Sequence, residues 1–203
     1  MRAGDPGLVD LKRERSRVWV TGFGPFLDVV DNPSARLARA LARRSGSGWE
    51  ARALELPTAF GRARAQIIEA VGDEADFVLA LGVGRGGLRL ERVARGVVSS
   101  ENEDVDGEVW CGRELGPDLE NALPLAAWAE QLGGEPPFTV SEDCGGYVCN
   151  AMNHQVLSAW PGRALFVHVP RDLSDSADFA AVEGQLAALI DLAVAHLCRR
   201  VEP

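Results

Sequence analysis

The sequence predicts an α/β fold in which a mainly parallel sheet is covered by helices. Short segments rich in β-branched and apolar residues alternate with stretches whose apolar residues recur at helical spacing. One of these segments, residues 77–81, is apolar at every position, which is typical of a strand buried on both faces. Strands that alternate with helices indicate a parallel sheet with crossover helices, so we expect that architecture here.

Five strands are expected, each ended by glycine, proline or a polar turn. They cover residues 17–21, 51–56, 77–81, 138–140 and 164–169. Pro57 and Pro170 stop the second and the last strand.

Helices are expected between the strands. Asn32 is placed as the N-cap of the first and Pro33 as its first helical residue, and apolar residues follow at helical spacing. Further helices are expected at residues 63–71, 123–132, 147–160 and 176–200, with a short helical stretch through Leu90, Val93 and Ala94. Residues 99–121 are acidic and turn-rich and are expected to form a surface loop.

The chain has 203 residues and neither a repeat nor a linker, which predicts one domain. Residues 1–16 are polar and are expected to form a flexible leader, and residues 17–203 to form a single α/β domain. The start lacks the apolar core of a signal peptide, and no stretch of about 18 apolar residues is present, so we expect a cytoplasmic protein without a membrane partner. The net charge of −9 argues against a nucleic-acid partner, because neutralising phosphates needs a basic surface.

Four cysteines are present, and none of them forms a CxxC pair: Cys111, Cys144, Cys149 and Cys198. In a cytosolic protein the default is free thiols. Each could then be buried apolar filler, a metal ligand or a nucleophile.

Candidate functional residues follow the ends of the predicted strands, where ligands bind in folds of this class. If these strands are parallel, one edge of the sheet brings together a thiol, an imidazole, a carboxylate and two phenyl rings. These groups belong to Cys149, His168, Glu91, Phe23 and Phe26.

Cys149 is a candidate nucleophile because of its place in the chain. Gly145 and Gly146 predict a tight turn, and the helix expected from Tyr147 puts Cys149 in its first turn. Unpaired N–H groups and the helix dipole there favour a thiolate and could stabilise an oxyanion. The alternative is a buried cysteine in a helix.

His168 closes a buried strand just before a proline and could act as the general base for Cys149. Glu91 could orient the imidazole, as the third member of a triad does. The alternatives are a hydrogen-bonded structural histidine and a solvated carboxylate on a helix. Phe23 and Phe26 could form a small pocket for a flat, uncharged group, or a hydrophobic plug beneath their loop.

These segments together resemble the pyroglutamyl peptidase I family, the pyrrolidone-carboxylate peptidases. The resemblance is carried by four blocks in family order: residues 20–26 with 32–34, residues 84–94, residues 141–150 and residues 166–170.

The resemblance implies a cysteine exopeptidase that removes N-terminal pyroglutamate (5-oxoproline) from peptides. Cys149 would be the nucleophile, His168 the base and then the acid, and Glu91 the orienting carboxylate. The substrate-binding residues it implies are Phe23, Phe26, Asn32 and Val83. It also implies a three-layer mixed sheet with helices on both faces, no metal or organic cofactor, and a homo-oligomer, either tetramer or dimer.

The chain departs from the family pattern at several positions around these blocks. Leu27 stands where the family usually has glycine, and Cys144 where it has alanine. The segment from Gly82 to Gly84 is one residue short, with Val83 in place of a usual glutamine. Arg89 replaces a small hydroxyl residue, and Gly96 replaces an asparagine. These departures bear on substrate fit and rate.

Three other interpretations remain open. The first is a nucleotide-binding oxidoreductase, because Gly82–Gly87 reads GxGxxG after a strand and Glu103 lies about 20 residues further on. The second is a weak or inactive homologue that acts as a binding protein. The third is a redox role, in which oxidation joins Cys144 to Cys149 and blocks the nucleophile.

Overall fold

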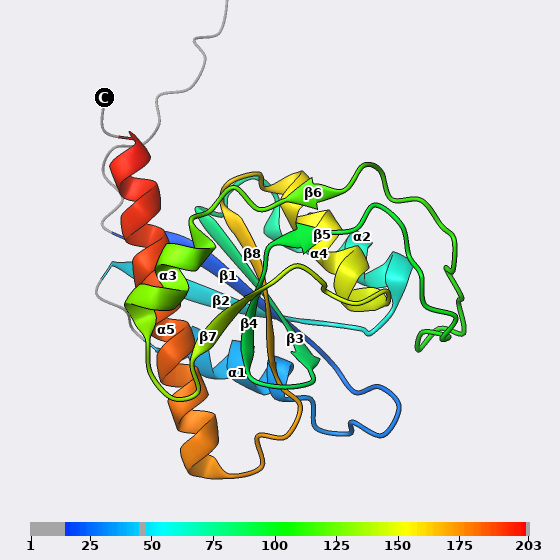
Figure 1. Cartoon of the computed structure of the whole chain (residues 1–203), viewed down its shortest axis with the longest axis horizontal. Coiled ribbons are helices and arrows are strands. Elements are labelled where there is room, and N and C mark those ends of the chain that lie inside the picture. The colour runs from blue at the N-terminus through cyan, green and yellow to red at the C-terminus, as the bar shows by residue number, and fades with distance from the viewer. Residues whose placement is uncertain (1–14, 45–47, 202–203) are drawn as a thin grey trace, which may run out of the picture.

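The computed structural model describes residues 15–44 and 48–201 (Figure 1). Most of the expected leader therefore lies outside the described residues. Ser16, the last residue assigned to it, begins the first strand instead.

A mixed sheet of six strands forms the centre of the domain. Its order is β2 (Trp49–Leu56), β1 (Ser16–Phe23), β3 (Phe77–Gly84), β8 (Ala164–Pro170), β4 (Leu88–Glu91) and β7 (Phe138–Ser141). The first four strands of this order run parallel. β4 is antiparallel to β8, and β7 is parallel to β4. A second, two-stranded sheet pairs β5 (Val93–Ala94) with β6 (Leu119–Glu120).

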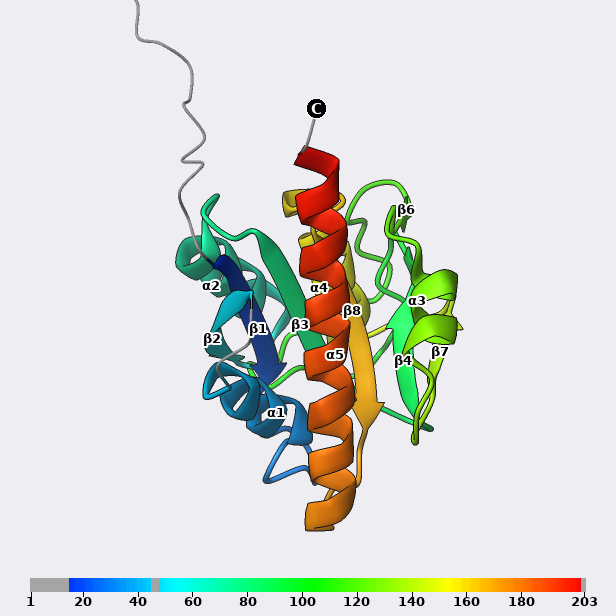
Figure 2. The same cartoon turned by 90° about the vertical axis from the view of Figure 1, so that its left-hand side faces the viewer.

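Helices cover both faces of the sheet, as expected for three layers. One face is covered by α1 (Pro33–Ala42), α3 (Leu125–Leu132) and α5 (Ser176–Val201), and the other by α2 (Phe60–Val71) and α4 (Val148–Ala159). In Figure 2, α5 crosses in front of the sheet, and α1 and α3 flank it. Alternate residues of β3 enter the two cores, which explains its uninterrupted apolar run.

The predicted start of the first helix is confirmed. Asn32 is the N-cap, Pro33 is the first helical residue, and the Ser34 N–H donates to Asn32 Oδ1 at 3.1 Å. This side-chain acceptor satisfies one of the N–H groups that a helix leaves unpaired at its start.

The short helix expected through Leu90, Val93 and Ala94 is wrong, because this segment forms β4 and β5. Leu88 and Leu90 enter the core on the face of the sheet that α1, α3 and α5 cover. Arg89, between them, takes the opposite face because successive strand residues alternate. The spacing of the apolar residues in this short segment is compatible with either a helix or a strand. β4 takes the strand conformation because it pairs with β7 on one side and with β8 on the other.

The sheet is mixed and mostly parallel, as expected, but the condition that would gather all the strand ends at one edge is not met by β7. Because β7 runs against β8, its carboxyl end lies at the opposite edge of the sheet from the ends of β1, β3 and β8. The segment at 142–147 leads from this end to the start of α4.

Within the described part of the chain, α5 is the one helix that is long and apolar enough to cross a membrane by length and composition. Its apolar residues have another use, since Val182, Leu186, Leu189 and Ile190 are buried against the sheet. α5 is therefore a core helix of the domain, which accounts for its composition.

Candidate active site

The loop after β1 is held open by contacts with the start of α1. The Phe23 N–H donates to Ser34 Oγ at 2.9 Å, and Asn32 Nδ2 donates to the Gly24 carbonyl at 3.0 Å. A Cβ on Gly22 would collide with the backbone of Ser34, so only glycine lets the strand pass so close to the helix. These contacts fix the positions of Phe23 and, beyond it, Phe26.

The turn before α4 is fastened to the loop at 99–121. The Gly146 carbonyl accepts from the N–H groups of Ser99 (3.1 Å) and Ser100 (2.9 Å). Gly145 has φ +77°, which favours glycine, and a Cβ on Gly146 would force the Ser99 side chain to move. The Tyr147 hydroxyl donates to the Glu103 carbonyl at 2.7 Å.

The start of α4 carries Cys149 over the middle of the sheet. Cys149 Sγ lies 3.0 Å from the point where a Cβ of Gly82 would stand. The fully buried Asn150 anchors this turn through hydrogen bonds to the Arg95 N–H (2.8 Å), the Arg95 carbonyl (3.0 Å) and the Val97 carbonyl (3.3 Å). The N-cap Tyr147 makes no side-chain cap hydrogen bond, so the first N–H groups of α4 can meet a ligand.

His168 and Glu91 form a buried pair beneath Cys149. His168 is 4% exposed and Glu91 is fully buried, and His168 Nδ1 lies 2.7 Å from Glu91 Oε1. This bond makes Nδ1 the donor and leaves Nε2 for another partner. The side chain of Cys149 also interacts with the His168 ring.

The charge state of His168 follows from these neighbours. Burial lowers the pKa of the imidazole, but the Cys149 thiolate and the Glu91 carboxylate outweigh burial and raise its pKa to about 9. The pair is therefore suited to the thiolate–imidazolium form, in which a positive ring lies between two negative groups.

Cys144 differs from Cys149 in its surroundings. It is buried, and burial together with the charge of Cys149 raises its pKa well above the usual value. Cys144, Glu91 and His168 each place a ligand atom within 4.8 Å of the others, a set that could hold a soft divalent cation. His168 and Glu91 already bond each other through Nδ1 and Oε1.

A cavity of about 180 Å³ opens above Cys149. Of the predicted site residues, it is lined by Phe23, Phe26, Asn32, Val83, Cys149 and His168. Glu91 lies behind His168, away from the cavity wall. The structure thus brings all seven predicted residues into one site.

Sequence reasoning missed other lining groups, among them Thr58 and Tyr147. Thr58 follows Pro57 at the end of β2 and donates to the Gly24 carbonyl at 3.4 Å. The rule that ligands bind beyond strand ends could have found Thr58, since it points to the segment after every parallel strand.

The structure shows the surroundings of two departures from the family pattern. Leu27 is 79% exposed and does not line the cavity, and its φ of +47° lies in the left-handed region. Gly96 lies against the Gly116 carbonyl, with which any Cβ would collide. Glycine at position 96 therefore suits this chain's own backbone path.

The glycine-rich segment from Gly82 to Gly87 does not form a dinucleotide site. It joins β3 to β4, a second strand, whereas the pyrophosphate fingerprint needs a helix to begin there. The oxidoreductase interpretation therefore loses its structural basis.

A larger cavity of about 620 Å³ lies at the other edge of the sheet, where β1 begins. It is lined by Ser16, Arg163 and Cys198, among others, and contains none of the predicted site residues.

Comparison with known proteins identifies the family. The family model described as pyroglutamyl peptidase matches residues 16–185. The chain belongs to the pyroglutamyl peptidase family. A pyrrolidone-carboxylate peptidase of Gloeobacter violaceus is 34% identical over 166 residues, covering 76% of this chain and 81% of the relative. One of Streptomyces coelicolor is 33% identical over 168 residues, covering 76% and 78%.

Solved structures of the pyroglutamyl peptidase family share the fold. The pyrrolidone carboxyl peptidase of Thermococcus litoralis superposes with a TM-score of 0.80 at 21% identity, covering 91% of this chain and 96% of that one. Pyroglutamyl peptidase I of Bacillus amyloliquefaciens gives 0.75 at 26% identity, covering 90% and 98%.

Proposed function

We propose that this chain is a cysteine exopeptidase that removes N-terminal pyroglutamate from peptides. The observation that carries the proposal is that Cys149 and His168 line one small cavity while His168 Nδ1 is bonded to the buried carboxylate of Glu91. Cys149 acts as the nucleophile, His168 as the base and then the acid, and Glu91 as the group that orients the ring.

Cys149 is preferred to Cys144 as the nucleophile for two physical reasons. Cys149 stands in the first turn of α4, where the helix dipole stabilises a thiolate, and its side chain interacts with that of His168. Cys144 is buried, with a raised pKa, and remains a neutral thiol.

The cavity suits a single small ring. Its volume of about 180 Å³ is below the roughly 300–1,000 Å³ of sites that hold larger ligands. The pyroglutamyl lactam is flat and uncharged, so Phe23 and Phe26 hold it through ring contacts. Asn32 braces their loop, and Val83 forms part of the wall.

In the acylation step, the Cys149 thiolate attacks the carbonyl carbon of the pyroglutamyl residue. The N–H groups at the start of α4 stabilise the negative oxygen that forms. His168 gives its proton to the leaving amine as the peptide C–N bond breaks, which leaves a thioester on Cys149.

In the deacylation step, His168 takes a proton from water as the water oxygen attacks the thioester. The C–S bond breaks, 5-oxoproline leaves, and the thiolate–imidazolium pair is restored. Glu91 stabilises the charged ring in both halves of the cycle.

The test is release of a fluorophore from a pyroglutamyl-linked reporter by the reduced protein. We expect Cys149→Ala to abolish release and Cys144→Ala, the matched control, to retain most of it. A prolyl reporter, which lacks the lactam carbonyl, should be a poor substrate.

The other outcomes discriminate between alternatives. Release from the prolyl reporter alone would support peptidase activity but contradict the proposal that the cavity recognises a lactam ring. Inactivation by Cys144→Ala but not by Cys149→Ala would make Cys144 the nucleophile in place of Cys149. Silence on both reporters in folded, reduced protein would favour a binding protein that keeps the fold.

Cytoplasmic location and homo-oligomerisation, as a tetramer or dimer, remain predictions from the sequence and its family resemblance. Sedimentation of the purified protein measures the second of these directly.

A further inference from the structure

An arginine lies beside the carboxylate at the base of the site. Arg89 and Glu91 are two residues apart on β4 and therefore share a face, and Arg89 is directly opposite His168 in the antiparallel pair of β4 and β8. Arg89 Nε lies 3.3 Å from Glu91 Oε1, the same oxygen that accepts from His168 Nδ1 at 2.7 Å.

The Arg89 guanidinium is held near the ring of His168 by a backbone carbonyl. Arg89 Nη1 donates to the Arg85 carbonyl at 3.0 Å. A Cβ on Gly84 would stand 2.7 Å from Arg89 Nη2 and 3.0 Å from two carbons of the His168 ring, so guanidinium and imidazole are neighbours across this glycine.

Glu91 needs such a neighbour because it is fully buried. Its Oε2 has no hydrogen-bond partner in the described structure, and its Oε1 has a single hydrogen bond, from His168. A buried carboxylate with so few donors is held in place by a nearby cation. Arg89, 29% exposed, supplies that positive charge without closing the cavity.

We propose that Arg89 is a positioning residue of the active site: it holds the Glu91 carboxylate oriented toward His168, and its positive charge sets the electrostatic balance of the thiolate–imidazolium pair. The inference rests on the proposed function for its catalytic meaning. The charges then alternate from the Cys149 thiolate through His168 and Glu91 to Arg89.

The direction of the effect follows from charge alone. The groups that face His168 in the described structure are Glu91 and Arg89 from β4, Cys149 from α4 and Cys144 from the segment before α4. Removing the cation raises the proton affinity of both the imidazole and the thiol. Both limbs of the pH profile of kcat/KM should therefore move to higher pH, by about one unit.

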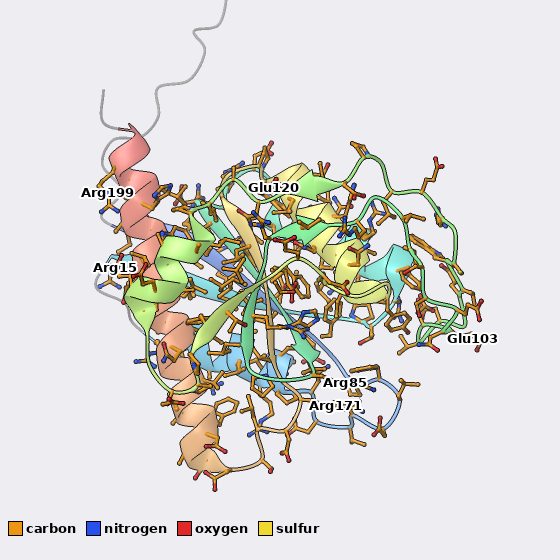
Figure 3. The ribbon with its side chains drawn as sticks, viewed as in Figure 1. Arg15, Arg85, Glu103, Glu120, Arg171 and Arg199 are labelled. Carbon is orange, nitrogen blue, oxygen red and sulfur yellow. The ribbon has the colours of Figure 1, made fainter. Side chains whose placement is uncertain are left out.

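The experiment compares Arg89→Ser, Arg89→Lys and the wild type. Serine is the type of residue the family carries at this position, so the variant is expected to fold. Arg89→Ser should move both limbs upward, and Arg89→Lys should leave them near those of the wild type. Arg171→Gln is the control, because Arg171 follows β8 at the same edge (Figure 3) and pairs with the exposed Asp28.

A titration without substrate separates this inference from the proposed function. The His168 ring can be followed by NMR, its signal among the three histidines being assigned by its loss in His168→Asn. We expect its titration to move upward in Arg89→Ser even if no reporter is cleaved. An unchanged His168 titration in folded Arg89→Ser, or loss of activity without movement of either limb, would overturn the proposal.

Discussion

At the scale of single residues, Cys144 and Cys149 lie five positions apart yet occupy different environments. The Gly145–Gly146 turn could be read from the sequence, and with it the place of Cys149 in the first turn of a helix. The burial of Cys144 could not be predicted, because it depends on how the segment before α4 folds over the sheet. The complete burial of Glu91 could not be predicted either, since acidic residues are mostly exposed.

The fall of kcat/KM at high pH, the basic limb of the pH profile, should follow the loss of the imidazolium proton from His168. Its pKa of about 9 means that the imidazolium is present below that pH and is lost as the pH rises through it. We expect kcat/KM to fall above about pH 9 in the wild type and at lower pH in Glu91→Gln, because the carboxylate helps to raise the pKa. Glu142→Gln, which changes an exposed carboxylate, should leave the limb in place, and an unmoved limb in Glu91→Gln would contradict this role.

Oxidation by peroxide tests the pairing of the two thiols. The Cys149 thiolate attacks peroxide to give a sulfenic acid. Cys144 then displaces water from this sulfur, its own proton leaving with the water, and a disulfide forms. We expect mass spectrometry to show a Cys144–Cys149 peptide that has lost two hydrogens, and reductant to restore activity. Cys144→Ala should lose this recovery after excess peroxide, and recovery equal to the wild type would exclude the disulfide.

Leu27 carries a backbone cost that glycine would remove. Its φ of +47° is disfavoured for residues with a Cβ, and its side chain is 79% exposed, so little burial is lost on truncation. We expect Leu27→Gly to raise the free energy of unfolding by about 0.5–1 kcal/mol. Val30→Gly, in the same loop and 80% exposed, should lower it instead, as urea unfolding would show.

At the scale of elements, α4 depends on buried amides rather than on a side-chain cap. Asn150→Ala removes three hydrogen bonds at its first turn and should cost about 2–3 kcal/mol of stability and at least tenfold in kcat/KM. Asn153→Ala, the control, loses one bond, to the Val93 carbonyl (3.1 Å), one turn further from the cavity. It should cost about 1 kcal/mol and leave activity near that of the wild type. Equal activity of the two folded variants would show that Asn150 does not position the turn.

The elements were predictable to different degrees. Strands that cross the whole sheet and helices with clear caps were recovered to within a few residues, as for α1 and β3. β4 was not, because four residues hold too few apolar positions to separate a period of two from a helical period. Its strand conformation comes from pairing with β7 and β8, which are distant in sequence.

At the scale of the whole molecule, the layers could be predicted and the reversal of two strands could not. The alternation of strands and helices favoured a parallel sheet. The direction of each strand depends on how the chain connects it to its neighbours, and the spacing of apolar residues does not reveal that connection. All seven candidate site residues still came together. Five of them lie in or follow β1, β3 and β8, which end near one place, while Cys149 reaches it from the start of α4 and Glu91 from β4.

The attachment of the Gly146 carbonyl to Ser99 and Ser100 has a consequence for unfolding. The turn that positions the nucleophile is fastened to an irregular loop and not to the six-stranded sheet. Loops open at a lower free energy than the core of a fold, so the support of the reactive thiol is expected to fail first. Opening of residues 99–121 would release the turn while the sheet and its two cores stay folded. As urea is raised, catalytic competence and the hydrogen-exchange protection of the Ser99 and Ser100 amides should therefore disappear together, before circular dichroism reports loss of the helices.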